Sequence, residues 1–359
     1  MSASPIVDAV VAVHDESRPI DRAVASLSAS GLRPGSELRI TVVCHNIDPD
    51  RIARRLTAFE GAGLRLLPLA DGISSAAGPF NAGVEAATGR YVSILGSDDF
   101  LEPGALAAWR EIADEATADA VIAPQVHQGG APVRTPPVRR LHRGALHPLK
   151  DRLIYRTAPL GLIARDAVER LELSFTPGLV TGEDQSFSAR LWFGGRGLRY
   201  ASGSPRYVVG ADAATRITTT PRPLRDVFAF IDHLSGDDWF ATLPQDARRA
   251  IAVKFVRVHI VESARVRIEA GAWTADDHAC AAGLVERLRH AAPGFERTLA
   301  IADRRALDAI VDAGAGAERI AALAQARRRF GMPSTLLTRS SALLAADAPL
   351  RFMAASALL

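Results

Sequence analysis

The first 125 residues alternate short apolar segments with amphipathic segments of helical periodicity, and this alternation constrains the fold more than any other feature. The apolar segments predict strands at Ile6–Val13, Leu38–Cys44, Leu64–Pro68, Arg90–Leu95 and Ala120–Ala123. Helices are predicted between them at Ile20–Ser30, Asp50–Glu60, Pro79–Ala87 and Gly104–Ala116. Repeated strand-helix-strand order is typical of βαβ units, so the sequence predicts an α/β fold with a mostly parallel sheet.

The composition changes after the proline-rich break at residues 218–223 and becomes rich in alanine. Apolar residues then recur at helical spacing in Val253–Ile268, Ala279–Ala291 and Ile320–Phe330. We therefore predict an α/β domain over residues 1–220 and a helical domain over residues 221–359. The segment Leu343–Leu359 is predicted as an amphipathic helix that caps the second domain or contacts a partner or membrane.

Charge and cysteine content exclude several classes of protein. The chain has 43 basic and 40 acidic residues, and this balance gives no sign of a nucleic-acid-binding protein. Two distant cysteines, Cys44 and Cys280, exclude a dense disulfide framework. The N-terminal segment does not resemble a signal peptide, and no apolar run approaches the roughly 18 residues that span a bilayer. We expect a cytoplasmic protein, either free or bound peripherally at the inner face of the membrane.

Residues 127–152 lack periodicity and are rich in proline and in basic side chains. Asp151 is the one acid among six basic residues, which are Arg134, Arg139, Arg140, Arg143, Lys150 and Arg152. Such a segment is usually a solvated loop. Its charge also suits a phosphate-bearing substrate or an anionic membrane surface.

Two adjacent carboxylates, Asp98 and Asp99, follow the buried strand that ends near Leu95. Open α/β sheets bind ligands at the carboxyl ends of their strands, and hard oxygen ligands suit Mg²⁺ or Mn²⁺. The alternative is that these acids cap the helix predicted to begin at Gly104.

Three further segments stand in a fixed order around this pair. His14 and Asp15 follow the first strand, Phe80-Asn81-Ala82-Gly83 begins a helix, and Glu183-Asp184 precede an aromatic residue at a predicted helix start. With Thr88-Gly89-Arg90-Tyr91 and Gly96-Ser97-Asp98-Asp99, they resemble the motifs of the family 2 nucleotide-sugar glycosyltransferases over roughly residues 5–220. The resemblance implies the GT-A fold, a Rossmann-like, mixed but mostly parallel sheet with helices on both faces.

The resemblance also implies roles for individual residues. Asp184 would be the general base, with Glu183 as an alternate or a positioning residue, whereas Asp99 would hold a divalent metal, Mg²⁺ or Mn²⁺, on the donor diphosphate. Asp212 would replace a metal-binding histidine that many relatives carry. The residues expected to contact the donor nucleotide are His14, Asp15, Asn46, Asn81, Asp98, Arg206 and Arg216.

Several positions depart from the family pattern. The second strand ends in Cys44-His45-Asn46 where relatives often carry an aspartate that reads uracil, Phe80 replaces an arginine, and Gly96 replaces the first acid of the metal motif. These substitutions leave open a catalytically silent family member that serves as a binding or assembly subunit. Helix caps remain the alternative for Glu183 and Asp184.

Two other enzyme classes share the predicted sheet. A dinucleotide-dependent oxidoreductase would need a glycine-rich fingerprint after the first strand, and residues 13–18 contain no glycine. A nucleotidyltransferase would need a basic, glycine-rich loop there, of which Ser17-Arg18-Pro19 is a poor version. We therefore expect an inverting transferase that moves a sugar from a nucleotide donor to a glycan, a lipid-linked saccharide or a cell-wall polymer. The helical domain would bind the acceptor or form a homo-oligomer.

Overall fold

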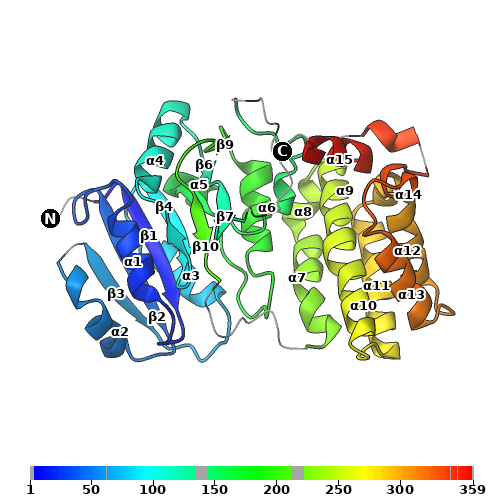
Figure 1. Ribbon diagram of the computed structural model, residues 1–359, viewed down its shortest axis with the longest axis horizontal. Coiled ribbons are helices and arrows are strands. Elements are labelled where there is room, and N and C mark those ends of the chain that lie inside the picture. The colour runs from blue at the N-terminus through cyan, green and yellow to red at the C-terminus, as the bar shows by residue number, and fades with distance from the viewer. Residues whose placement is uncertain are drawn as a thin grey trace. The chain divides into compact units, whose positions relative to one another are not determined.

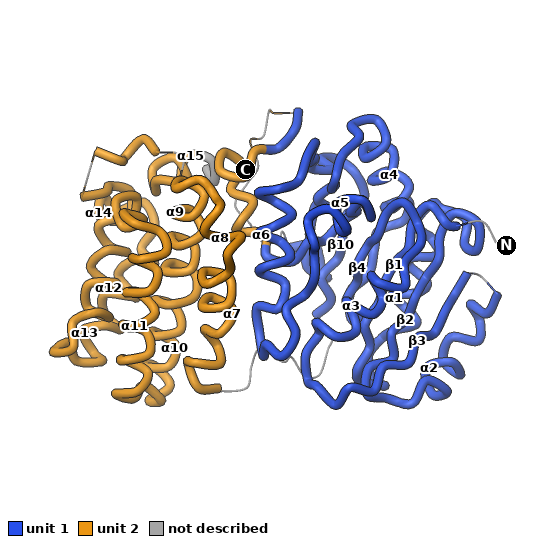
Figure 2. The backbone as a smooth tube through the Cα atoms, turned by 180° about the vertical axis from the view of Figure 1, so that it is seen from behind, with its two compact units in different colours: residues 1–135, 143–146, 157–220 blue, residues 136–142, 147–156, 221–359 orange. Residues whose placement is uncertain are grey.

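The computed structural model describes residues 4–211, apart from 62, 132, 134–138, 140, 141 and 143, and residues 222–357, apart from 340 and 346. The chain forms two compact units, which Figure 2 shows in different colours. Unit 1 comprises residues 1–135, 143–146 and 157–220. Unit 2 comprises residues 221–359 together with two earlier segments, 136–142 and 147–156.

A seven-stranded sheet with the order β3-β2-β1-β4-β8-β6-β9 forms the centre of unit 1. Strands β1, β2, β3 and β4 run parallel to one another, whereas β8 is antiparallel to both β4 and β6. The mostly parallel α/β sheet predicted from the sequence is therefore confirmed. The strands are β1 (Val7–Val13), β2 (Leu38–His45), β3 (Leu64–Leu69), β4 (Tyr91–Gly96), β6 (Ala120–Ile122), β8 (Gly161–Ala164) and β9 (Arg199–Tyr200).

The helices of unit 1 flank this sheet (Figure 1), and several of them bury apolar residues in its core. They are α1 (Ile20–Ser28), α2 (Pro49–Arg55), α3 (Ala77–Glu85), α4 (Ala105–Ala116), α5 (Arg165–Arg170) and α6 (Gln185–Gly194). In α1, the side chains of Ile20, Val24 and Leu27 are fully buried in the core. The residue that precedes α4 is Gly104, at φ +81°, so neither Asp98 nor Asp99 caps this helix and that interpretation is wrong.

A second, three-stranded sheet was not predicted from the sequence because its strands have only two or three residues. It has the order β5-β10-β7, with β5 at Phe100–Leu101, β7 at Gln125–His127 and β10 at Tyr207–Val209. β10 pairs antiparallel with β5 and parallel with β7. This sheet brings residues near 210 to the segment that follows β4.

Gly83 sets how closely α3 lies on the central sheet. A Cβ atom at this position would come within 2.2 Å of Val10 Cγ1 on β1. Because no side chain fits in that space, glycine is required where the helix crosses the strand. The close approach holds the second half of α3 against the middle of β1.

Unit 2 is helical. Its helices are α7 (Leu224–Gly236), α8 (Asp238–Thr242), α9 (Gln245–Lys254), α10 (Val261–Glu269), α11 (Ala275–Ala291), α12 (Ile301–Val311), α13 (Ala317–Ala326), α14 (Pro333–Leu336) and α15 (Pro349–Ala357). A π-helical turn, Phe255–Ile260, joins α9 to α10. Within the described parts of the chain, no helix combines the length and the apolar character needed to cross a membrane.

The basic segment before residue 152 and the C-terminal helix both belong to unit 2 in part or in full. Asp151 is fully buried and accepts hydrogen bonds from Arg139 Nε (2.8 Å) and His147 N (2.8 Å), so the described part of this basic segment is not simply a solvated loop. The predicted C-terminal helix corresponds to α15, where Phe352 lies beneath the guanidinium groups of Arg152 and Arg257. Lys150 and Arg152 belong to the same ordered segment, whereas Arg134, Arg140 and Arg143 lie outside the described residues.

Candidate active site

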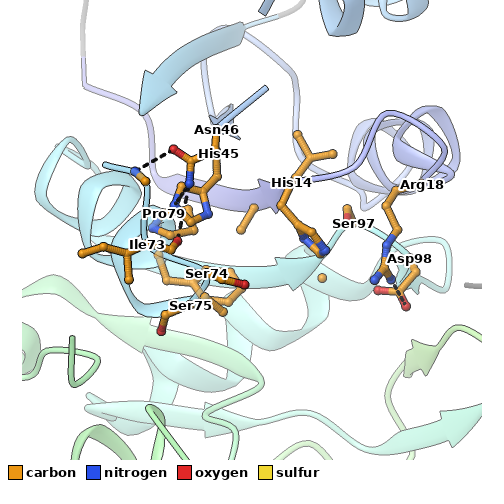
Figure 3. Close-up of a pocket in the computed structure, with 16 residues that line it drawn as sticks. His14, Arg18, His45, Asn46, Ile73, Ser74, Ser75, Pro79, Ser97 and Asp98 are labelled. Atoms are coloured by element: carbon orange, nitrogen blue, oxygen red, sulfur yellow. Dashed lines mark hydrogen bonds and ion pairs between the residues drawn. The ribbon is translucent and has the colours of Figure 1, made fainter. Parts of the chain in front are cut away.

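A cavity of about 470 Å³ opens in unit 1 at the carboxyl ends of β1, β2 and β4 (Figure 3). The loop between β3 and α3 and the first turns of α3 close it on the other side. Its lining residues are Ala12, Val13, His14, Arg18, His45, Asn46, Gly72, Ile73, Ser74, Ser75, Ala76, Pro79, Phe80, Gly96, Ser97 and Asp98. This position is where parallel α/β sheets bind their ligands.

One end of the cavity is charged. Arg18 Nη1 lies 2.7 Å from Asp98 Oδ2, and the Arg18 side chain is only 8% exposed. The carbonyl of Arg18 accepts a hydrogen bond from Arg55 Nη1 at 2.8 Å, which fixes the backbone of the loop. Burial, together with the charge of Arg18, lowers the pKa of His14 from its ordinary value. His14 is therefore a neutral hydrogen-bonding group at pH 7, and Arg18 is the cation of this end.

The opposite end carries neutral and apolar groups. Figure 3 shows His45, Asn46, Ile73 and Pro79 at the end of the cavity away from Arg18 and Asp98. Asn46 has a left-handed backbone, at φ +57°. Its side chain makes hydrogen bonds to the loop after β3. Its Oδ1 accepts from Gly72 N at 3.0 Å, and its Nδ2 donates to Asp71 Oδ1 at 3.2 Å. Asn46 thus lines the predicted donor site while shaping the loop beside it.

Asp99 points away from the cavity toward β10. Its Oδ2 accepts a hydrogen bond from the Tyr207 hydroxyl at 2.5 Å, and its Oδ1 accepts from Gly210 N at 2.8 Å. Burial and the neighbouring Asp99 charge raise the pKa of Tyr207 well above its ordinary value, so the hydroxyl keeps its proton and donates. Asp99 therefore ties β10 to the end of β4, and the carboxylate that lines the cavity is Asp98.

A divalent metal ion would need more oxygen ligands than the described residues bring together. Such an ion takes about six oxygen ligands, several of which are carboxylates, donor phosphates or water. Within the described ranges, no group of three or more His, Cys, Asp or Glu side chains is close enough to hold an ion. Asp98 is the one acid among the described lining residues, and Arg18 already neutralises it. The described residues alone do not fit a metal centre, and Asp212 lies outside them.

Asn81 belongs to a contact that positions the acidic segment. Its Nδ2 donates to Phe175 O and its Oδ1 accepts from Phe175 N, both at 2.8 Å. The Phe175 ring packs between Phe80 and Phe187, with centroid distances of 5.3 and 4.6 Å. Asn81 was predicted to contact the donor, but it is not among the lining residues, and its amide instead holds the loop that leads to Glu183.

Glu183 and Asp184 lie at the end of that loop, immediately before α6. Thr176 N donates to Glu183 O at 2.9 Å, which closes the loop between Phe175 and the two acids. Burial raises the pKa of the Glu183 carboxyl. Asp184 is the residue immediately before α6, and its side chain makes no capping hydrogen bond to that helix, so the alternative that remains for it is an acid favoured by the helix dipole.

The other predicted donor-binding residues have different surroundings. Asp15 accepts a hydrogen bond from Ser17 N at 2.8 Å and is not a lining residue. Arg206 Nε donates to Glu102 Oε1 at 2.8 Å, outside the cavity lining. Asp212 and Arg216 lie outside the described residues. The sequence reasoning overlooked Arg18 and Asp71 as site residues, although both follow strands at their carboxyl ends.

A cavity at the carboxyl ends of β1, β2 and β4 in a mostly parallel sheet, with the Arg18–Asp98 ion pair at one end and neutral groups at the other, is typical of a nucleotide-binding α/β protein. Residues 8–171 match the family model described as glycosyl transferase family 2. Residues 8–171 are thus similar to the family 2 glycosyltransferases, as the motifs predicted, and the fold is GT-A. A comparison with curated proteins gave no match.

Solved structures of S. aureus TarS are similar in fold. TarS 1-349 matches with a TM-score of 0.73 at 15% identity, over 90% of this chain and 91% of that one. Its complex with UDP-GlcNAc matches with a TM-score of 0.76 at the same identity and coverage. Another TarS structure matches with a TM-score of 0.71 at 14% identity, but this chain spans only 55% of it.

Proposed function

We propose that this protein transfers a sugar from a nucleoside diphosphate donor to a hydroxyl group of an acceptor. The observation that carries the proposal is the polarity of the cavity in the family 2 domain. Arg18 supplies a guanidinium for the diphosphate at one end, and neutral and apolar groups suit a nucleoside at the other. The complex of TarS with UDP-GlcNAc supports a uridine diphosphate sugar as the donor.

The reaction is a single displacement at the anomeric carbon. The acceptor oxygen attacks this carbon, the bond to the diphosphate oxygen breaks, and a carboxylate takes the acceptor proton. One displacement inverts the anomeric configuration. Asp184 is the proposed base, and Glu183 is the alternative, since burial raises its pKa toward the range of an effective base. The acceptor remains a glycan, a lipid-linked saccharide or a wall polymer.

Arg18 is the proposed partner of the departing diphosphate, because the described cavity contains no second fixed positive charge. Mg²⁺ or Mn²⁺ on the donor stays a prediction from the family resemblance. Asp98, which faces the cavity, is better placed to contribute to such a site than Asp99, whose oxygens already accept from Tyr207 and Gly210. Assaying transfer after chelation, and again after adding back each cation, tests this prediction.

Replacing Arg18 by glutamine should weaken UDP binding by about tenfold or more, because a charge-assisted hydrogen bond contributes roughly 1.5–3 kcal/mol. Isothermal titration calorimetry of the full chain, in EDTA and again in Mn²⁺, measures the change. Arg51→Gln is the matched control, since Arg51 is 57% exposed and pairs with Glu16 outside the cavity. Equal UDP affinities in Arg18→Gln and Arg51→Gln would refute the assignment of Arg18.

The proposed function itself is tested with the unmodified protein. Incubation with UDP-GlcNAc and other UDP-sugars should release UDP, faster when a suitable hydroxyl acceptor is added. Thermal unfolding should also shift upward with UDP, since a ligand that binds only the folded state stabilises it. UDP binding without any turnover, across a panel of acceptors, would favour the silent binding subunit over the enzyme.

A further inference from the structure

Exposed hydrophobic side chains are concentrated in one short segment of unit 2. The described residues include seven exposed large hydrophobic residues, and four of them lie between positions 330 and 344. These four are Phe330 (70% exposed), Met332 (52%), Leu337 (41%) and Leu344 (68%). Single exposed apolar residues are common on soluble proteins, whereas several together beside polar residues mark a surface that contacts another molecule or a membrane.

A tight turn between α13 and α14 carries Phe330 and Met332. Gly331, which separates them, has φ +84°, a conformation that glycine adopts without strain. The Thr335 hydroxyl donates to Met332 O at 2.9 Å, and Thr335 N donates to the same oxygen at 2.9 Å. These two bonds hold the turn against α14, so ordered backbone presents the Phe330 ring and the Met332 thioether to solvent.

The turn lies beside α15 and the start of α12. A hollow of about 50 Å³ has Phe330, Ala300 and Met353 of α15 in its lining, and Ala300 forms an antiparallel bridge with Thr338. Figure 1 shows α14 and α15 at the same end of unit 2, and Leu344 lies in the short helical turn that leads into α15. The four apolar residues and the exposed arginines of this end form what we call the C-terminal surface; these arginines are Arg328, Arg329, Arg339 and Arg351.

The C-terminal surface is basic as well as apolar. Residues 327–359 contain five arginines and one acid. Arg328 and Arg339 form ion pairs with acids of α10 and α12, at 2.7 and 2.9 Å. Arg329 and Arg351 are exposed, and across the described residues neither of them has a carboxylate partner. The surface therefore presents two uncompensated positive charges together with its apolar side chains.

We propose that the C-terminal surface docks this protein on a lipid membrane with anionic headgroups. Phe330, Met332 and Leu344 enter the interfacial region of the bilayer, and Arg329 and Arg351 lie at the level of the headgroup phosphates. Membrane binding of this kind grows with the apolar area that is buried and with the attraction to anionic lipids, and this surface supplies both. The proposal concerns unit 2 and does not rest on the proposed function.

A second copy of this chain fits the surface less well than an anionic bilayer does. A two-fold contact brings the same surface of both copies together. Two arginine-bearing surfaces would then face each other, and the residues that form the C-terminal surface include no acid to neutralise Arg329 or Arg351. Lipid phosphates supply that negative charge, while the acyl chains cover Phe330 and its apolar neighbours.

Co-sedimentation of the full chain with lipid vesicles tests the proposal. The wild type should bind vesicles of equimolar phosphatidylcholine and phosphatidylglycerol at least about tenfold more tightly than vesicles of phosphatidylcholine alone, because each arginine near an anionic surface contributes to binding. Added salt should weaken binding to the mixed vesicles, since ions screen exposed charges.

Two substitutions separate the apolar and the electrostatic contributions. Phe330→Ser should weaken binding to the mixed vesicles by about tenfold, because the ring no longer leaves water. Arg329→Gln should weaken it by roughly fivefold, the contribution of one charge at such a surface. The matched controls are Val266→Ser, at a residue that is 49% exposed on α10, and Arg319→Gln, at the opposite end of α13 from the turn. Neither control should change binding, and thermal unfolding should show that all four variants fold.

A tryptophan at the same position reports the contact directly. Phe330→Trp should bind the mixed vesicles at least as tightly as the wild type, because tryptophan favours the membrane interface. Its emission, after subtraction of the wild-type signal, should shift to shorter wavelength when the vesicles are added. Val266→Trp should show no such shift.

Several results would overturn the proposal. These are equal binding to the two kinds of vesicle, binding to neither, and wild-type binding by folded Phe330→Ser. A wild-type dimer in analytical ultracentrifugation without lipid, converted to monomers by Phe330→Ser, would also overturn it, because the C-terminal surface would then be a contact between two copies.

Discussion

Asp184→Asn is expected to lower the rate of sugar transfer by about 10²–10⁴, the contribution typical of a general base. The amide keeps the size of the side chain but cannot take the proton of the acceptor hydroxyl. Donor affinity should stay close to that of the wild type, because Asp184 is not among the residues that line the described cavity. Steady-state rates, together with calorimetric UDP binding, separate the two effects.

The neighbouring acid and a remote one provide the comparisons for this experiment. Glu183→Gln should lower the rate less than Asp184→Asn if Asp184 is the base, and the order should reverse if Glu183 is. Asp166→Asn removes the same charge from the exposed first turn of α5 and should leave transfer unchanged. A rate near that of the wild type in both Asp184→Asn and Glu183→Gln would contradict a base at this loop.

Gly83→Ala is expected to destabilise the protein by about 1–3 kcal/mol, the usual cost of overpacking a core. The sign of the change in unfolding free energy is informative, since replacing glycine by alanine inside an ordinary helix stabilises a protein by roughly 0.5–1 kcal/mol. The added Cβ would meet Val10 Cγ1 at 2.2 Å, so α3 must move away from β1. Chemical denaturation measures the loss. UDP affinity should fall as well, because α3 carries Pro79 and Phe80 into the cavity.

A double-mutant cycle isolates the contact between these two residues. Removing the opposing methyl groups with Val10→Ala should recover part of the stability lost in Gly83→Ala, which gives a favourable coupling energy. Gly236→Ala is the matched control, since no atom lies within 4 Å of a Cβ built at that glycine. If Gly83→Ala were as stable as Gly236→Ala, the close packing of α3 on β1 would be refuted.

The sequence predicted the parallel half of the sheet well because each element there carries its own signal. Strands β1 to β4 are short and almost wholly apolar, and the predicted bounds differ from the observed ones by at most one residue. β8 was missed, because a four-residue strand that inserts antiparallel between β4 and β6 is specified by its partners rather than by its own pattern. The same holds for β5, β7 and β10.

The candidate site was likewise predicted only in part from the sequence. The order of the motifs was enough to indicate the resemblance to family 2 and to point to the carboxyl ends of β1, β2 and β4. It did not show which of two adjacent aspartates faces the cavity, because that depends on Tyr207 and Gly210, more than a hundred residues away. The role of Asn81 likewise depends on Phe175, which no local pattern connects to it.

The sequence by itself therefore determined the fold class, the resemblance to family 2 and the segments from which the site is built, since periodicity and motif order are local properties of the chain. Only the tertiary structure decided how those segments are used. It turned Asp99 toward β10, paired Asp98 with Arg18, and placed Asp71 behind His45. Side-chain direction and hydrogen-bond partners depend on residues that become neighbours only when the sheet has formed.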